Sequence, residues 1–149
     1  MKKHLFSAFA VIVIAFQCAV FTSCQQDSII DESALPQTAL DFIHQWFPEA
    51  TIASIWKDVE GFHVEYQVTL GLSQQIEFDH KGNWTDIDCG TMAVPAGLVP
   101  TEIATLIGQR WPEAFVSEIS HDRFGWDVEL SNGLDLEFNN KYILRELDD

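Results

Sequence analysis

The stretch HQWFPEA, at positions 44–50, decides how this chain of 149 residues is organised, because QRWPEA follows at 109–114. In both copies an aromatic residue precedes Pro-Glu-Ala, and Pro48 and Pro112 occupy equivalent places. Proline lacks the backbone N–H that continues a helix, and it disfavours helical backbone in the residue before it. Each proline is therefore predicted to end a helix and to turn the chain towards a strand.

The segments before these two prolines have the spacing of amphipathic helices. Pro36 and Pro100 stand 64 residues apart and suit the first turn of a helix, where a missing N–H is harmless. Apolar residues then recur at helical intervals, at Ala39, Ile43, Trp46 and Phe47 in the first copy and at Ile103, Leu106, Ile107 and Trp111 in the second. The sequence predicts one short helix in each copy.

After each helix the apolar period changes to two, which predicts β-strands. Apolar residues alternate with polar ones from 62 to 70 in the first copy and from 124 to 130 in the second. A further alternating stretch follows in each copy, and here IEFDHKG at 76–82 matches LEFNNKY at 136–142. Matches that keep the same order over this length indicate a duplication.

We predict an α+β fold, a tandem duplication of a unit that has one helix and a four-stranded antiparallel sheet. In each two-layer unit the helix covers the apolar sheet face, and the other face is polar and open to water. The copies are expected at 35–89 and 99–149, with 90–98 as the linker between them. Because a unit of about 55 residues is marginally stable alone, the two units should pack as one body.

The first residues have the layout of an export signal. Lys2 and Lys3 precede an uncharged apolar run from 5 to 22. A basic start followed by such a run is typical of a secretory signal peptide, which we predict at 1–23. The run is also almost long enough to span a bilayer, so an uncleaved anchor helix is the alternative.

FTSC at 21–24 favours the signal peptide. It resembles the lipobox of bacterial lipoproteins, in which a small residue precedes a cysteine that receives a diacylglyceryl group, although Phe21 departs from the usual leucine. We predict that Cys24 carries the lipid and that 24–34 is a flexible polar tether. Gln25, by resemblance to lipoprotein sorting signals, indicates the outer membrane rather than the inner one.

The chain is strongly acidic, with a formal net charge of −15 that becomes −17 when Lys2 and Lys3 leave with the signal. This charge argues against binding of nucleic acids or anionic headgroups. It favours a basic protein or peptide, or metal ions, as the partner. After removal of Cys18 and lipidation of Cys24, Cys89 is left alone, and we expect an inert, buried thiol.

The sequence lacks motifs for catalysis or for a cofactor. Its histidines show no HxxxH or HExxH spacing, which argues against a zinc hydrolase. In FDHKGNWTDID at 78–88, Asp79, Asp86 and Asp88 could act as calcium ligands. The glycine-centred spacing of an EF-hand is missing, so a solvated hairpin is favoured. An enzyme that uses Cys89 or a carboxylate pair is the weaker hypothesis. We predict no catalytic residue, no cofactor and no dedicated metal site.

The polar sheet face is the candidate binding surface. By strand alternation it should carry six carboxylates, at Glu65, Glu77, Asp127, Glu129, Asp135 and Glu137. Like charges on neighbouring strands repel, so this face is either a surface for a cationic partner or only a solvated surface. Trp56 is a candidate anchor, because its counterpart Ser120 shows that the repeat core needs no aromatic residue there. The alternative is that Trp56 is buried between the repeats.

The order of these features resembles a known family. The chain has a lipobox and a tether, followed by two copies of one pattern: a Pro-led helix, aromatic-Pro-Glu-Ala, Tyr/Trp-x-Val-x-Leu and apolar-Glu-Phe. This order is similar to that of the PepSY-like, beta-lactamase-inhibitor-like secreted bacterial proteins and lipoproteins. The resemblance covers about 35–147. The resemblance implies an α+β fold of tandem helix-plus-four-strand repeats. It also implies a non-catalytic binding or inhibitory role outside the cytoplasm. Fold similarity alone does not establish function, and we carry over no inhibitory residues.

We predict a lipid-anchored cell-envelope protein that binds a basic protein or peptide, as an inhibitor-like or regulator-like module. Trp56 and the six carboxylates would form its partner surface. The alternatives are a calcium- or other cation-binding envelope protein and, less favoured, a thiol or carboxylate enzyme.

Overall fold

The computed structural model describes residues 28–71 and 73–148, so the predicted signal peptide at 1–23 and the predicted lipidation site Cys24 lie outside the described residues. The strands of the described part are β1 (Ser28–Ile29), β2 (Ile52–Glu60), β3 (His63–Leu70), β4 (Gln75–Asp79), β5 (Trp84–Asp88), β6 (Val116–His121), β7 (Gly125–Leu130), β8 (Asp135–Asn139) and β9 (Leu144–Asp148). Its helices are α1 (Gln37–Trp46) and α2 (Thr101–Arg110), with short 3-10 helices η1 (Glu32–Ala34) and η2 (Ala96–Leu98). None of the helices in these residues combines the length and apolarity needed to cross a membrane.

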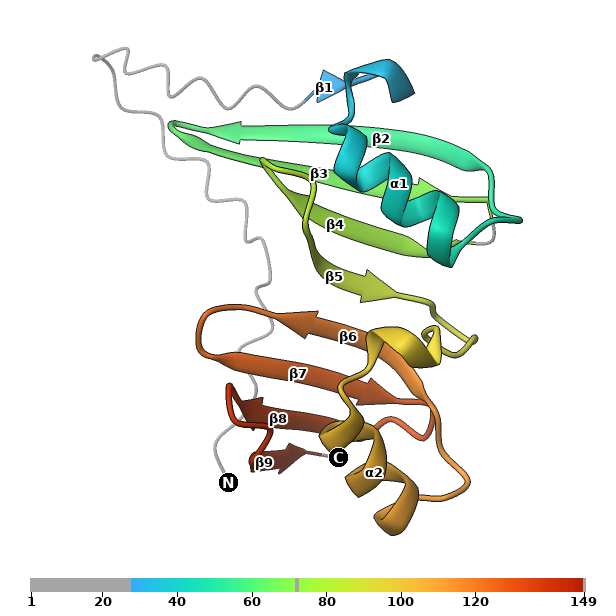
Figure 1. Ribbon diagram of the computed structural model, residues 1–149, viewed down its shortest axis with the longest axis vertical. Coiled ribbons are helices and arrows are strands. Elements are labelled where there is room, and N and C mark those ends of the chain that lie inside the picture. The colour runs from blue at the N-terminus through green and yellow to red at the C-terminus, as the bar shows by residue number, and fades with distance from the viewer. Residues whose placement is uncertain (1–27, 72, 149) are drawn as a thin grey trace, which may run out of the picture.

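The strands of the described residues all belong to one nine-stranded antiparallel sheet, in the order in which they occur along the chain (Figure 1). The predicted fold was therefore wrong. The chain does not form two units that each have a helix and a four-stranded sheet, because β5 pairs with β6 and joins all the strands. Ile87 and Ile119 face each other across this junction, and both are completely buried. Joining the two edges satisfies their free backbone groups and continues the core through the junction.

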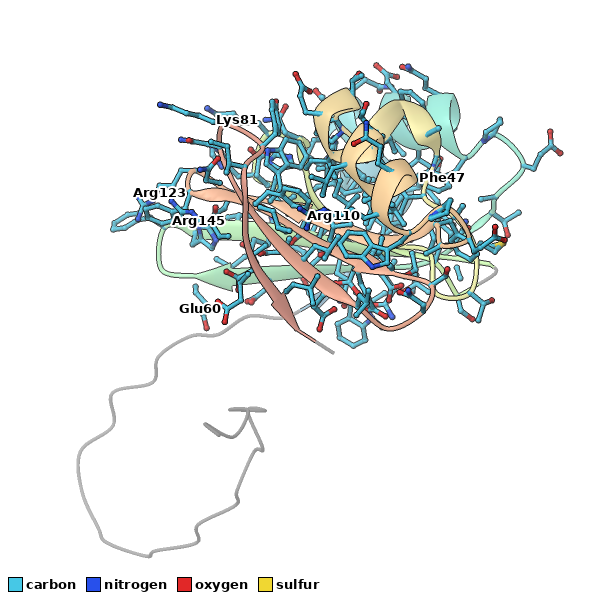
Figure 2. All side chains as sticks on the ribbon, turned by 90° about the horizontal axis from the view of Figure 1, so that it is seen from below. Phe47, Glu60, Lys81, Arg110, Arg123 and Arg145 are labelled. Carbon is cyan, nitrogen blue, oxygen red and sulfur yellow. The ribbon has the colours of Figure 1, made fainter. Side chains whose placement is uncertain are left out.

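Both α-helices lie on the same side of the sheet (Figures 1 and 2). Ile43 of α1 and Ile107 of α2 are buried in the core that the helices form with the sheet. Phe42 of α1 also meets Phe78 of β4 edge-on, with ring centroids 5.7 Å apart. Strand alternation leaves the polar side chains on the face that points away from the helices.

The helices end at the two aromatic-Pro-Glu-Ala motifs. α1 ends at Trp46 and α2 at Arg110. The N–H groups of Phe47 and Trp111 donate the final helical hydrogen bonds, at 2.8 and 2.7 Å. The proline that follows each aromatic residue blocks another turn, as the sequence predicted.

The segment before α1 is attached to the edge of the sheet. β1 pairs with β2 through Ser28↔Lys57 and Ile29↔Trp56. The N–H of Ile30 extends the pairing with a 3.0 Å hydrogen bond to β2. The described part of the predicted tether therefore contains β1 and η1.

Candidate binding surface

The sheet face that points away from the helices carries a continuous series of carboxylates, which we call the acidic face. Strand alternation places them there, and the pairing of β5 with β6 brings the carboxylates of β2–β5 and of β6–β9 onto one surface. The acidic face consists of Asp58, Glu65, Glu77, Asp86, Asp88, Glu118, Asp127, Glu129, Asp135, Glu137 and Glu146.

The register of the sheet sets many of these carboxylates directly opposite one another. The pairs are Asp58↔Glu65, Glu77↔Asp86, Asp88↔Glu118, Glu118↔Glu129, Glu129↔Asp135, Asp127↔Glu137 and Glu137↔Glu146. Directly opposite residues have Cβ atoms about 4.5–5.5 Å apart, and like charges in these positions destabilise a sheet. A positively charged ligand on this face would relieve the repulsion.

The effect on pKa values is largest at the junction of β5 and β6. Burial raises the pKa of Asp86 to about 6, and the charges of Glu77 and Asp88 add to the shift. Burial also raises the pKa of Glu118 to about 7, with further contributions from Asp86, Asp88, Glu129 and Asp135. Glu118 is therefore partly protonated near neutral pH.

The six carboxylates predicted from the sequence all lie on the acidic face. Glu65 is on β3, Glu77 on β4, Asp127 and Glu129 on β7, and Asp135 and Glu137 on β8. Glu118 was missed, and Asp86 and Asp88 were considered only as ligands in a hairpin. The alternation of residues within 84–88 could have placed the two aspartates on the polar face. The position of all three residues in the middle of that face depends on the pairing of β5 with β6.

Asp79 does not join Asp86 and Asp88 around one ion. Its carboxylate accepts hydrogen bonds from the N–H groups of Lys81 (2.8 Å) and Asn83 (2.9 Å) and so closes the turn between β4 and β5. Burial alone would raise the pKa of Asp79, but these hydrogen bonds and one from the Asn83 side chain lower it. Across 28–71 and 73–148, no group of three or more His, Cys, Asp or Glu side chains is arranged to hold a metal ion.

Trp56 lies on β2 at one end of the acidic face and is 43 % exposed. It is therefore not buried between the repeats. It belongs to a shallow cavity of about 270 Å³ that is lined by Trp56, Lys57, Asp58, Glu65, Tyr66, Gln67 and Glu77. The cavity combines an aromatic ring with three carboxylates, which is a suitable environment for a cationic group.

Comparison with known proteins identifies the family. A family model described as "Putative beta-lactamase-inhibitor-like, PepSY-like" matches residues 63–146, more than half of the chain. The chain belongs to this PepSY-like family. The match confirms the resemblance that the sequence motifs indicated. No curated protein matches the PepSY-like chain.

Solved structures of similar proteins share the fold of this PepSY-like chain. A "putative periplasmic protein" of the DUF2874 family from Bacteroides vulgatus ATCC 8482 is 32 % identical, with a TM-score of 0.81 over 85 % of this chain and 99 % of its own. A "putative calcium-regulated periplasmic protein" from Bacteroides thetaiotaomicron is also 32 % identical, with a TM-score of 0.79 over 83 % of this chain and 97 % of its own. A "putative periplasmic protein of unknown function" from B. vulgatus is 28 % identical, with a TM-score of 0.79 over 83 % of this chain and 99 % of its own. These descriptions support a location of the PepSY-like chain in the cell envelope.

Cys89 of the PepSY-like chain, the thiol of the weaker enzyme hypothesis, is only 2 % exposed. Burial raises the pKa of Cys89 to about 11 and Asp88 adds to the shift, whereas a hydrogen bond with Gln74 lowers it. The thiolate is the nucleophilic form of cysteine, so a thiol that stays protonated at neutral pH reacts slowly. The predicted burial of this thiol is confirmed.

Proposed function

We propose that this PepSY-like protein is a non-catalytic binding module of the cell envelope, and that its acidic face binds a basic segment of another protein or peptide. The register of the sheet carries the proposal, because it sets carboxylates opposite one another on most strand pairs from β2 to β9. Solubility is served equally well by charges of mixed sign, whereas like charges in opposite positions reduce stability. Binding of a cationic partner would neutralise these carboxylates and so explain the arrangement.

The raised pKa values support the same proposal. Burial and neighbouring carboxylates hold the pKa of Asp86 at about 6 and that of Glu118 at about 7. A lysine or arginine side chain nearby favours the ionised form of both groups, so binding releases protons. The affinity for a basic ligand should therefore increase as the pH rises through about 6 to 7.

The protein is further proposed to be anchored in the outer membrane by a lipid on Cys24. The lipobox-like FTSC at 21–24 and the following Gln25 support this placement. Cys24 and Ser28 are four residues apart, which an extended chain spans in at most about 14 Å. The edge of the sheet that begins with β1 would then stay close to the membrane.

The test of the acidic face is binding of an acetylated octalysine peptide to the full-length protein in a non-ionic detergent. Glu129→Lys combined with Asp135→Lys should weaken binding about tenfold and reduce its dependence on salt, because attraction scales with the product of the charges. The control is Glu102→Lys on α2 combined with Glu113→Lys in the turn after α2, two exposed positions where the net charge changes equally. Equal losses in both variants would show that only net charge matters. Failure of the wild-type protein to bind would refute the proposal.

Calcium binding at the acidic face is a second candidate function. One observation favours it: a solved neighbour with 32 % identity is described as "calcium-regulated". The described residues hold no three carboxylate side chains around one point, so carboxylates of the acidic face would have to move together to supply the oxygen atoms that bind calcium. Melting curves in millimolar CaCl₂, MgCl₂ or EDTA separate the candidates. A Tm that rises only with calcium supports a calcium site, and three identical curves argue against it.

A further inference from the structure

At the β1–β2 end of the acidic face, large apolar side chains lie next to the carboxylates. The register sets Trp56 opposite Ile29 on one side and opposite Gln67 on the other. Ile29 is 65 % exposed and Trp56 is 43 % exposed, so both are open to solvent at this corner. Exposed apolar groups within a charged surface are typical of binding sites.

The carboxylates around Trp56 come from three neighbouring strands. Asp58 lies two residues further along β2, on the same face, and pairs with Glu65 of β3. Glu77 of β4 pairs with Gln67, whose Nε2 lies 3.4 Å from its Oε1. All of these side chains line the cavity of about 270 Å³. The lining therefore has three acidic groups and one exposed indole ring. It also includes Lys57, whose ammonium group lies over the Tyr66 ring, 5.8 Å from the ring centroid.

Asp58 carries one carboxylate oxygen without a hydrogen-bond donor among the described residues. Its Oδ1 is shielded from solvent and accepts no hydrogen bond from the described residues. Shielded carboxylate oxygens nearly always have a donor, because they lose hydration that only a hydrogen bond restores. Glu65 has such a partner, since its Oε1 lies 2.7 Å from Nε2 of His63. Because this oxygen is shielded, a ligand in the cavity reaches it only when the Asp58 carboxylate turns outwards.

We propose that this cavity binds one arginine side chain of the basic partner. The inference rests on the proposed function and adds a specificity site to it. A guanidinium group is planar, stacks on aromatic rings and presents a fork of N–H donors to carboxylates. Trp56 supplies the ring, and Asp58 and Glu65 supply the acceptors. A lysine ammonium is a compact, strongly hydrated charge and gains less from this combination.

A second cavity on the acidic face, on β6 to β8, has no aromatic residue in its lining. This cavity, of about 180 Å³, is lined by Glu118, Ser120, Asp127, Val128, Glu129, Asp135, Leu136 and Glu137. Basic residues should bind there through charge alone, without a preference between lysine and arginine. The Trp56 cavity would then fix which residue of the partner occupies which position on the face.

The test compares two acetylated, amidated pentapeptides of equal charge, one of five lysines and one with arginine at the centre. Both are titrated into the full-length protein in a non-ionic detergent. The arginine peptide should bind about fivefold more tightly. Trp56→Leu and Asp58→Asn should each remove this difference, because each weakens binding of the arginine peptide more than binding of the lysine peptide. Melting curves show whether each variant is folded.

Two matched controls locate the effect. Phe124→Leu changes another exposed aromatic residue, and Asp135→Asn removes a charge at the other end of the acidic face. Both should keep the fivefold preference. Equal binding of the two peptides to the wild-type protein overturns the arginine site but leaves the acidic-face proposal standing. Failure of both peptides to bind overturns both proposals.

Discussion

Asp88 and Glu118 stand directly opposite each other where β5 and β6 join the two halves of the sheet. Beside them Ile87 and Ile119 form the next pair, which is completely buried on the other face. Apolar packing on one face thus holds together strands whose carboxylates repel on the other. The stability of this junction should therefore depend on the protonation of its carboxylates.

The first prediction is that the free energy of unfolding falls as the pH rises through the raised pKa values. Burial and neighbouring charges raise the pKa of Asp86 to about 6 and that of Glu118 to about 7. A carboxyl with a raised pKa holds its proton more tightly in the folded state, so ionisation disfavours folding. The penalty is absent below the unfolded pKa, near 4, and is complete above about pH 7. We expect the protein to lose about 1–2 kcal/mol between about pH 5.5 and pH 8, after allowance for solvent screening.

Glu118→Gln is the direct check of this pH dependence. It should raise Tm at about pH 8 and flatten the decline of Tm with pH, whereas Glu102→Gln on the exposed side of α2 should do neither. His121 has the opposite effect, because burial lowers its pKa and its protonation in acid reduces stability. The decisive comparison therefore lies above about pH 6.5, where histidine is largely neutral. Parallel curves for wild type and Glu118→Gln would contradict the prediction.

The sequence predicted features that depend on neighbouring residues and missed one that depends on strands far apart in the chain. Pro48 and Pro112 located the helix ends, because a proline acts on its own turn. Alternation located carboxylates such as Glu65 and Glu129, because each side chain's face follows from its own strand. The pairing of Asp88 with Glu118 was not predicted, since a short alternating strand looks the same at an edge as in the middle of a sheet. The exposure of Trp56 also depended on this arrangement and was left open.

The second prediction concerns the shared core at the junction. Ile119→Ala should lower the free energy of unfolding by about 2–5 kcal/mol, because the side chain is completely buried and leaves a cavity. Ile143→Ala, at a residue that is 59 % exposed, should cost less than about 0.5 kcal/mol. Since the sheet is continuous through β5 and β6, urea should unfold both halves in one transition. Two separate transitions would show that the halves are independent.

The third prediction separates packing from backbone strain at two glycines. Gly82 has a φ of +84°, and a Cβ there would lie 2.9 Å from the backbone N of Ala39 and from Cβ of Pro36. Gly82→Ala should cost about 2–4 kcal/mol, because it adds strain and also pushes the start of α1 away from the sheet. Gly133 has a φ of +82° with nothing near its Cβ position, so Gly133→Ala should cost only about 1–2 kcal/mol. Equal losses, measured by urea unfolding, would contradict tight packing at Gly82.

The fourth prediction concerns the buried thiol. Cys89 is 2 % exposed, and burial raises its pKa to about 11. It should react with a thiol reagent at least about a hundredfold more slowly in the folded protein than in urea, because little thiolate is present and access is blocked. Cys89→Ser should bind the octalysine peptide as the wild type does, at a stability cost of about 1–3 kcal/mol for a buried hydroxyl. Loss of binding in a folded Cys89→Ser protein would point to a role for the thiol.

The last prediction concerns the anchor. Cys24→Ala should remove the acceptor of the lipid, so that the protein is released from membranes or remains unprocessed. Cys18→Ala is the matched control, because it changes a cysteine within the same apolar run and leaves FTSC intact. That variant should be cleaved and should fractionate with membranes like the wild type. If the apolar run were an uncleaved anchor helix, both variants would stay in the membrane fraction at full length, because a spanning helix does not need the cysteine. A Cys24→Ala protein that is cleaved before residue 24 and still remains with membranes would contradict lipid anchoring, since no acyl chain would then be present to hold it.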